Sequence, residues 1–226
     1  MAAPTVVFIS GVRQGIGRSL LERYLLLPNH IVIGTVRNPD TNSNLQALPT
    51  ATGSRSLLVS IENANPDDYA TALATITSEG INHIDVLIAN ARGSPPLKSI
   101  DDVPPEHLAS AYAVNTSSAL LYFQTFKPLL QAAAQPKWVS VSTAASSLAL
   151  MGEIGTYVAP AYGASKAALN WLTLRVFGDK NPHTSTGGRH AYGGTFERLQ
   201  SRLALDLRVD DSRSALRART VLVKYI

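Results

Sequence analysis

The chain has 226 residues, of which 45% are hydrophobic and 16% are charged; this composition excludes a solvated disordered chain and favours one compact globular domain. It contains no cysteine, which excludes disulfide frameworks, zinc-thiolate sites and cysteine nucleophiles. The formal net charge is +4, and the basic surplus lies late in the chain, because residues 1–166 hold six arginines and residues 167–226 hold eight.

Short β-rich runs alternate with longer helical patterns along the chain. The first run, residues 5–10, is apolar and β-branched and ends at a glycine, as in a strand buried on both faces of a parallel sheet. A helical stripe of apolar residues follows, from residue 16 to 27. The same patterns predict a weak helix after the second strand, further strands at 31–36, 56–61, 84–89 and 138–142, and helices at 66–79, 107–134 and 162–176. Five such alternations predict an α/β fold with right-handed crossovers and a doubly wound parallel sheet, the Rossmann arrangement.

The first expected strand leads into a turn with three glycines, in the segment SGVRQGIG. Glycines at a strand-to-helix turn let the backbone approach a pyrophosphate that lies on the helix N-terminus. Because this turn follows a buried strand and precedes an apolar-striped helix, it predicts dinucleotide binding by Gly11, Gly15, Ile16 and Gly17. The alternative is a purely structural glycine turn.

A basic residue follows the second expected strand, where the adenine ribose of a dinucleotide would lie. The strand IVIGTV runs into Arg37, and no carboxylate occurs between Ile31 and Pro39. A cation there would pair with the 2′-phosphate of NADP, whereas a carboxylate would repel it, so the sequence favours NADP as the cofactor. Arg13, in the glycine turn, would add a second positive group. The alternative is that both arginines face solvent.

A tyrosine and a lysine four residues apart, Tyr162 and Lys166, begin the last of these helices. Residues at this spacing share a helix face, so the ammonium would lie near the phenol and lower its pKa from the usual value near 10. Ser142 and Thr143 end the preceding strand, at the sheet edge where ligands bind. One of these hydroxyls would hold a carbonyl oxygen while Tyr162 protonates it. The alternative is a chance spacing on an exposed helix.

Together these motifs resemble those of the short-chain dehydrogenases and reductases. The resemblance spans about residues 5–175 and rests on SGVRQGIG, Ala89-Asn90-Ala91, Asn115 within AVNTS, Ser142-Thr143, and YGASK followed by AALN. Within the family, the segments GTVRNP, IANA and AYGASKAALNWL are most similar to fungal norsolorinic acid ketoreductase-like enzymes, which act on aromatic polyketide ketones.

The resemblance implies hydride transfer between a nicotinamide and a carbonyl carbon, with Tyr162 as the acid in reduction and the base in oxidation. It implies that Lys166 lowers the tyrosine pKa and binds the nicotinamide ribose. Asn115 would support a water-linked proton path, and Asn90 would line the adenine-ribose side. The family's catalytic serine corresponds to Thr143, so either Thr143 takes its role or Ser142 substitutes for it. The family also forms homo-oligomers through the helices that carry Asn115 and Tyr162.

Three departures from the family pattern lie within this region. Arg92 replaces the last glycine of the family's Asn-Ala-Gly and puts a bulky cation near the cofactor. Ser60 stands where the third strand usually ends in an aspartate that positions the adenine, and Glu62 nearby could compensate. The interval from Thr143 to Tyr162 is 19 residues, longer than usual in the family, which implies a longer loop over the substrate.

The family pattern stops after about residue 176, so we assign the catalytic dinucleotide-binding domain to residues 1–178 and an atypical arginine-rich tail to residues 179–226. A sixth strand ending in Pro-Gly, with the loop that closes over nicotinamide and substrate, is missing. The tail instead has a turn-forming stretch, a helical pattern over 196–207 and a strand-like run at 220–226 that could take the sixth sheet position. We interpret it as a truncated or altered C-terminal part, for example from another reading frame. A basic tail that binds nucleic acid is the disfavoured alternative, because aromatic residues are sparse in it.

The remaining features limit the partners. The five histidines lack the spacing of metal ligands, so no metal is expected. No run approaches about 18 uncharged apolar residues, and the first residues lack the pattern of a secretory signal, so we expect a soluble cytoplasmic protein with no membrane partner.

Two hypotheses for function follow. The first is an NADP-dependent oxidoreductase that acts on a small-molecule ketone or alcohol, with an aromatic or polyketide substrate from secondary metabolism. The second is a reductase-like domain that lacks the closing loop and is inactive or has a binding or non-redox role.

Overall fold

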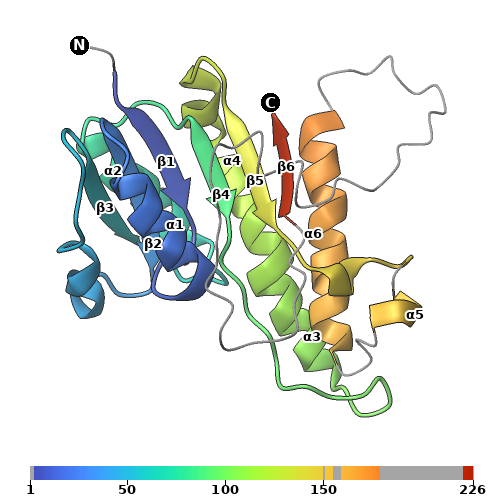
Figure 1. Cartoon of the computed structure of the whole chain (residues 1–226). Coiled ribbons are helices and arrows are strands. Elements are labelled where there is room, and N and C mark those ends of the chain that lie inside the picture. The colour runs from blue at the N-terminus through green and yellow to red at the C-terminus, as the bar shows by residue number, and fades with distance from the viewer. Residues whose placement is uncertain (1–2, 150, 155–158, 179–220, 226) are drawn as a thin grey trace.

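The computed structural model describes residues 3–149, 151–154, 159–178 and 221–225. Its centre is a six-stranded sheet in the order β3-β2-β1-β4-β5-β6 (Figure 1). Five of the strands are parallel: β1 (Thr5–Ile9), β2 (His30–Val36), β3 (Arg55–Ser60), β4 (Val86–Ala89) and β5 (Lys137–Val141). The expected doubly wound parallel sheet is therefore confirmed.

The sixth strand, β6 (Val221–Tyr225), takes the position that the sequence suggested, beside β5, but it runs antiparallel to it. Val221 lies opposite Val141 and Tyr225 lies opposite Lys137. The carboxyl end of β6 therefore lies at the sheet edge opposite to the one where β1 to β5 end. Our predictions for residues 179–220 lie outside the described residues, and the domain boundary at residue 178 stays a prediction.

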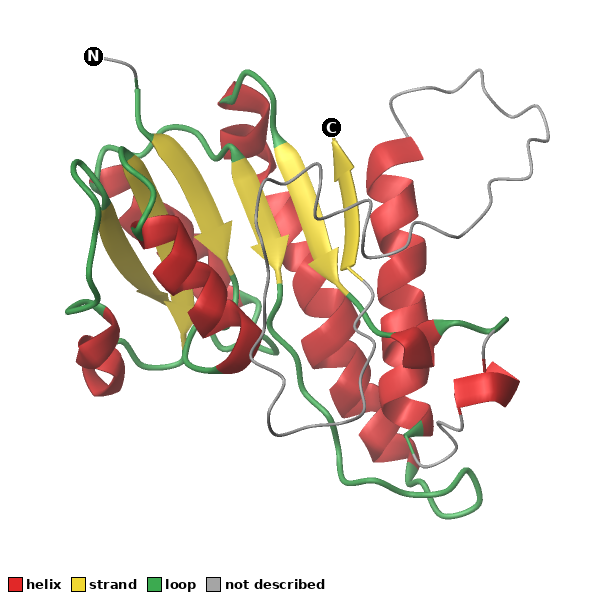
Figure 2. Cartoon of the chain, in the orientation of Figure 1, coloured by secondary structure: helices red, strands yellow, loops and turns green. Residues whose placement is uncertain are grey.

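Helices lie on both faces of the sheet (Figure 2). The larger ones are α1 (Gly15–Leu25), α2 (Asp67–Ser78), α3 (Pro105–Tyr112), α4 (Ser118–Ala132) and α6 (Pro160–Gly178). Shorter elements are the 3-10 helices η1 (Asp40–Leu45) and η3 (Ala144–Ser146) and the helix α5 (Met151–Ile154). The long helix expected over 107–134 is present and runs without a break through α3, the π-helical turn η2 (Ala113–Ser117) and α4.

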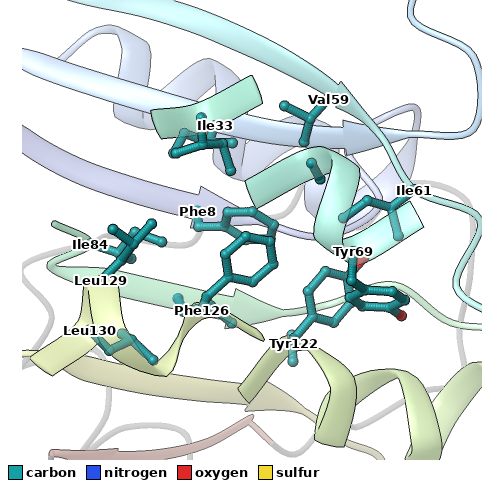
Figure 3. Packing of buried hydrophobic residues seen from close by; sticks show 14 of the residues in the cluster. Phe8, Ile33, Val59, Ile61, Tyr69, Ile84, Tyr122, Phe126, Leu129 and Leu130 are labelled. Carbon is teal, nitrogen blue, oxygen red and sulfur yellow. The ribbon is translucent and has the colours of Figure 1, made fainter. Parts of the chain in front are cut away.

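Alternate side chains of the strands form two cores. In β1, Val6 and Phe8 face one core while Val7 and Ile9 face the other, as the two-residue period of a strand requires. The first core packs on α2 and α4, and Figure 3 shows Phe8 against Tyr122 and Phe126 of α4, with ring centroids 5.6 and 4.7 Å apart. The second core packs on α1 through Leu20, Leu21, Tyr24 and Leu25. Figure 1 accordingly shows α1 in front of the sheet and α4 behind it.

The strand order reverses between β1 and β4, because the chain continues from β1 toward β2 and from β4 toward β5. In such sheets, ligands bind in the crevice beyond the carboxyl ends of the strands at this switch point. Ser10, Asn90 and Ser142 directly follow β1, β4 and β5 at that edge. Within the described ranges, no helix is long and apolar enough to span a membrane; a cytoplasmic location stays a prediction.

Candidate active site

The glycine turn closes tightly around the end of β1. Gly11 and Gly15 have positive φ angles of 72° and 62°, which side chains rarely tolerate. A Cβ on Gly17 would lie 2.2 Å from the carbonyl oxygen of Gly11, so no other residue fits there without a shift of the backbone. The amide of Gly11 donates to Thr35 Oγ1 at 2.9 Å, which ties the turn to the end of β2.

Asn90 and Ser10 lock this turn to the end of β4. Ser10 Oγ accepts hydrogen bonds of 2.9 Å from the backbone amides of both Asn90 and Ala91. The side-chain amide of Asn90 donates to the carbonyl oxygens of Ser10 and Gly11, at 2.9 and 3.3 Å. Asn90 is thus buried behind the turn, as a brace for it. That Asn90 also lines the adenine-ribose side of the cofactor site stays a prediction.

Arg37 lies at the other end of the crevice, directly after β2, and its side chain is exposed. Ser60, the departure from the family's aspartate, donates its hydroxyl to the carbonyl oxygen of Arg37 at 2.9 Å and so fixes the backbone there. The backbone amide of Glu62 donates to Asp68 Oδ2 at 2.7 Å, so this segment is tied to the start of α2. Arg13 is also exposed, with Gln14 Oε1 at 3.5 Å from its guanidinium.

Asn115 sits in the π-helical turn and is 1% exposed. Its side chain exchanges two hydrogen bonds with the backbone of Gly93, both 2.8 Å long, and donates a third to Ser165 Oγ at 3.0 Å. Ser165 lies between Tyr162 and Lys166 on α6, so Asn115 joins the segment after β4 to the helix that carries both residues. A π-helical turn of this kind, inside a longer helix, is a frequent feature of functional sites.

Lys166 is 1% exposed, and its ammonium donates to the carbonyl oxygen of Val141, at the end of β5, at 2.9 Å. Burial, and to a smaller extent the positive charge of Arg92, lowers its pKa to about 8. One donor of this ammonium is used at the end of β5. That the ammonium lies near the hydroxyl of Tyr162, as the spacing indicates, stays a prediction. The effect of Lys166 on the tyrosine stays a prediction.

The two hydroxyls after β5 differ in their surroundings. Ser142 is 3% exposed and donates to Asn170 Oδ1 at 2.5 Å. Asn170 in turn donates to Ser146 Oγ at 2.8 Å, and Ser146 donates to the carbonyl oxygen of Thr143 at 2.6 Å. Thr143 itself is half-buried, and among the described residues the one bond of its Oγ1 is a long one of 3.3 Å, accepted from the amide of Ala145. The hydroxyl of Thr143 is therefore the freer one, while that of Ser142 belongs to a buried network.

The sequence analysis missed Asn170 and Ser146. A signal for Asn170 existed, because it lies four residues after Lys166 and thus on the same face of the helix. Ser146 belongs to the short helix η3, which is too short to be predicted from a periodic pattern of apolar residues.

Tyr162 is half-buried and lines a small cavity beside the start of α6. The other lining residues come from the segment after β4 and from the start of α6: Ser94, Pro95, Pro96, Lys98, Val103, Ala159, Pro160 and Ala161. The long interval from Thr143 to Tyr162 contains η3 and α5, and its residues 150 and 155–158 lie outside the described part of the chain. No three histidine, aspartate or glutamate side chains of the described residues are grouped as metal ligands would be.

The fold and the crevice define the class of dinucleotide-dependent oxidoreductases. The chain belongs to the short chain dehydrogenase family, whose sequence model matches residues 5–184. It is 44% identical to the short-chain dehydrogenase srdF of Neurospora crassa over 82% of this chain and 74% of that protein. It is 31% identical to the norsolorinic acid ketoreductase of Aspergillus parasiticus over 95% of this chain and 82% of that protein. Among solved structures, the NADPH-bound carbonyl reductase from chicken fatty liver is similar, with a TM-score of 0.67 and 26% identity over 76% of this chain and 70% of that one. The resemblance stated from the motifs is therefore confirmed.

The residues of the glycine turn fit the nicotinamide dinucleotide that this family binds. Helix α1 begins at Gly15, has no acidic residue in its first turn and has no side-chain cap on its first amides. Those amides and the positive end of the helix dipole suit a pyrophosphate. A Cβ built on Gly15 would meet no atom within 4 Å, so the backbone there is open to close approach.

Proposed function

We propose that this oxidoreductase is an NADPH-dependent ketoreductase of secondary metabolism that reduces an aromatic or polyketide ketone. The observation that carries the proposal is the position of Tyr162, which lines a cavity one helical turn before the buried cation of Lys166. The substrate class is supported by the relatives named as norsolorinic acid ketoreductases.

The choice of NADP is supported by Arg37. Its exposed guanidinium follows β2, where it would face the adenine ribose, and no carboxylate stands between Ile31 and Pro39 to repel a 2′-phosphate. Arg13, in the glycine turn, would add to the positive potential on the same side. The bound cofactor of the similar chicken enzyme, NADPH, agrees with this choice.

When bound, the nicotinamide supplies the hydride that adds to the carbonyl carbon. The protein handles the proton: Tyr162 donates its phenolic proton to the carbonyl oxygen, which becomes the alcohol. Thr143 donates a hydrogen bond to the same oxygen and polarises the carbonyl, as an oxyanion-hole donor does. The ammonium of Lys166 stabilises the phenolate that remains until Tyr162 regains a proton from solvent.

Asn115 and Asn170 act through other groups. The side chain of Asn115 forms hydrogen bonds with Gly93 and Ser165, so it positions α6 against the segment after β4. Asn170 holds Ser142 and Ser146, and thereby the turn that presents Thr143. The water-linked proton path that the resemblance implies for Asn115 is part of the proposal.

The test uses the purified full chain. Thermal shifts with NADPH and NADH compare the two cofactors, and NADPH oxidation at 340 nm is followed with a panel of aromatic ketones. We expect the wild type to reduce at least one ketone. We expect Tyr162→Phe to lose this turnover while NADPH still raises its melting temperature. Binding of NADPH without turnover of any ketone would reject the assignment.

The direction of β6 favours a second candidate function. Because β6 is antiparallel, its carboxyl end lies at the sheet edge away from the crevice, whereas a parallel sixth strand would end beside the nicotinamide. The second candidate is therefore a reductase-like domain that binds the dinucleotide without redox turnover. The same panel separates the two candidates.

The association state is part of the proposal. Large apolar side chains are exposed on the outer helices, with Tyr112 of α3 40%, Leu120 of α4 37% and Trp171 of α6 62% exposed. These helices are the ones through which the family forms homo-oligomers, and covering the patches would bury apolar surface. Light scattering of the purified chain measures the association state directly.

A further inference from the structure

The structure fixes the backbone on both sides of Arg92, the residue that replaces a glycine of the family pattern. On one side, the amide of Ala91 donates to Ser10 Oγ at 2.9 Å. On the other side, Gly93 exchanges two 2.8 Å hydrogen bonds with the side chain of Asn115. Arg92 therefore extends an exposed side chain from a well-anchored point between the glycine turn and the π-helical turn.

The guanidinium of Arg92 has no acidic partner among the described residues. The ion pairs among the described residues join Arg18 with Glu22, Arg55 with Glu79 and His83 with Asp85, and none of them includes Arg92. Its charge lies close enough to Lys166 to lower the pKa of that lysine. Arg92 and Lys166 are thus two neighbouring cations, and neither forms an ion pair with a carboxylate of the described residues.

A third cation lies in the same segment. Lys98 is exposed and is the one charged residue among the nine that line the cavity of Tyr162. Most of the other walls are apolar and come from prolines, alanines and a valine. Asp101 and Asp102 follow in the sequence, but neither lines the cavity, and Asp102 Oδ2 accepts the hydroxyl of Ser99 at 2.7 Å.

We propose that Arg92 and Lys98 form an anion-binding rim of the substrate site, and that the substrate carries an anionic oxygen group on an apolar body. The apolar residues beside Tyr162 contact the body at the mouth of this small cavity, and the two cations hold the anion through charge-assisted hydrogen bonds, which are stronger than neutral ones. This specificity rests on the proposed ketone reduction at Tyr162. The segment 92–98 therefore selects the substrate as well as closing one side of the cavity.

The test compares two ketones that differ by one carboxylate, acetophenone and 4-acetylbenzoate, with the full chain and saturating NADPH. The readout is the ratio of kcat/KM for the acid to that for the neutral ketone, in the wild type, Arg92→Gly, Lys98→Gln and the double variant. Lys127→Gln, an exposed lysine on α4 outside the cavity lining, is the matched control. We expect the wild type to prefer the acid, each single variant to lower the ratio about tenfold, and the control to leave it unchanged.

Two results would overturn the proposal. One is a ratio that is the same in the wild type and in the double variant. The other is a rise in the KM of NADPH in Arg92→Gly, equal with both ketones and without a change in the ratio, because Arg92 would then serve the cofactor phosphates. Melting temperatures of all variants show whether each one folds.

A failure of ketone reduction itself would leave this proposal testable. In that case, calorimetry measures the binding of 4-acetylbenzoate to the NADPH-loaded protein. A dissociation constant that rises at least fivefold in the double variant supports the rim. An equal dissociation constant, or no binding to the wild type, rejects it.

Discussion

Substitution of the two hydroxyls after β5 separates a catalytic group from a structural one. Ser142 is 3% exposed and donates to Asn170 Oδ1 at 2.5 Å, whereas Thr143 is half-buried and accepts one bond of 3.3 Å from the described part of the chain. We expect Ser142→Ala to act mainly on stability and Thr143→Val to act mainly on turnover.

The magnitudes follow from these contacts. In Ser142→Ala, Oδ1 of the half-buried Asn170 loses its donor, which costs about 1 kcal/mol of unfolding free energy, or up to about 3 kcal/mol if water cannot replace the donor. In Thr143→Val, the lost contact caps only the three-residue helix η3 and is worth about 1 kcal/mol or less. Removal of a donor to the developing oxyanion, in contrast, lowers kcat by roughly 10²- to 10³-fold.

Urea unfolding and NADPH oxidation with one aromatic ketone measure both quantities for each variant. Thr143→Ser is the control, because it keeps the hydroxyl and should keep most of kcat. The reasoning is refuted if Ser142→Ala loses kcat by two orders of magnitude while Thr143→Val keeps it, since the hydroxyl that serves the substrate would then be that of Ser142.

Three further predictions concern the charged residues of the crevice. First, kcat should fall as the pH rises through about 8, because Lys166 has a pKa lowered to about 8 and loses there the charge that stabilises the phenolate; a flat kcat profile from pH 6 to 10 would contradict this. Second, Arg37→Glu should raise the KM of NADPH at least about tenfold and leave that of NADH nearly unchanged, because a carboxylate repels the 2′-phosphate; steady-state kinetics with both cofactors checks it, and equal effects on both would argue against a ribose contact. Third, Lys166→Met should abolish ketone reduction and raise the unfolding free energy at pH 7, measured by urea unfolding; a less stable variant would show that the ammonium stabilises the fold.

The strands and the glycine turn could be predicted because each rests on local chemistry. Strands buried on both faces read as continuous apolar runs, and TVVFI and VLIA became β1 and β4. The glycine turn needs residues without a Cβ, and the overlap of a Cβ on Gly17 with the carbonyl oxygen of Gly11 gives the physical reason. The order of the strands then follows from right-handed crossovers and the fold class.

Features that depend on distant contacts could not be predicted. The π-helical turn at 113–117 leaves the apolar period of the long helix almost unchanged, yet it lies between α3 and α4 within that helix and carries Asn115. The direction of β6 is invisible in its sequence, because a short apolar strand can pair with β5 either way. The choice between Ser142 and Thr143 required knowledge of Asn170, which comes from a different element.

Lys166 gives an independent physical argument that this end of the crevice serves function. Its pKa falls from 10.5 to about 8, mainly because burial disfavours the charge, and this shift corresponds to about 3 kcal/mol. The sign is unfavourable to folding: below pH 8 the folded and unfolded chains both carry the proton, so the cost is present in full, and it disappears only as the pH rises from about 8 to 10.5. None of the ion pairs among the described residues offsets it, and the hydrogen bond to Val141 satisfies only one of three donors. An apolar side chain at this position would make a more stable protein at neutral pH. Lys166 is a buried cation that weakens the fold, and it lies one helical turn from Tyr162, which lines a cavity. A site that must stabilise a phenolate requires such a cation.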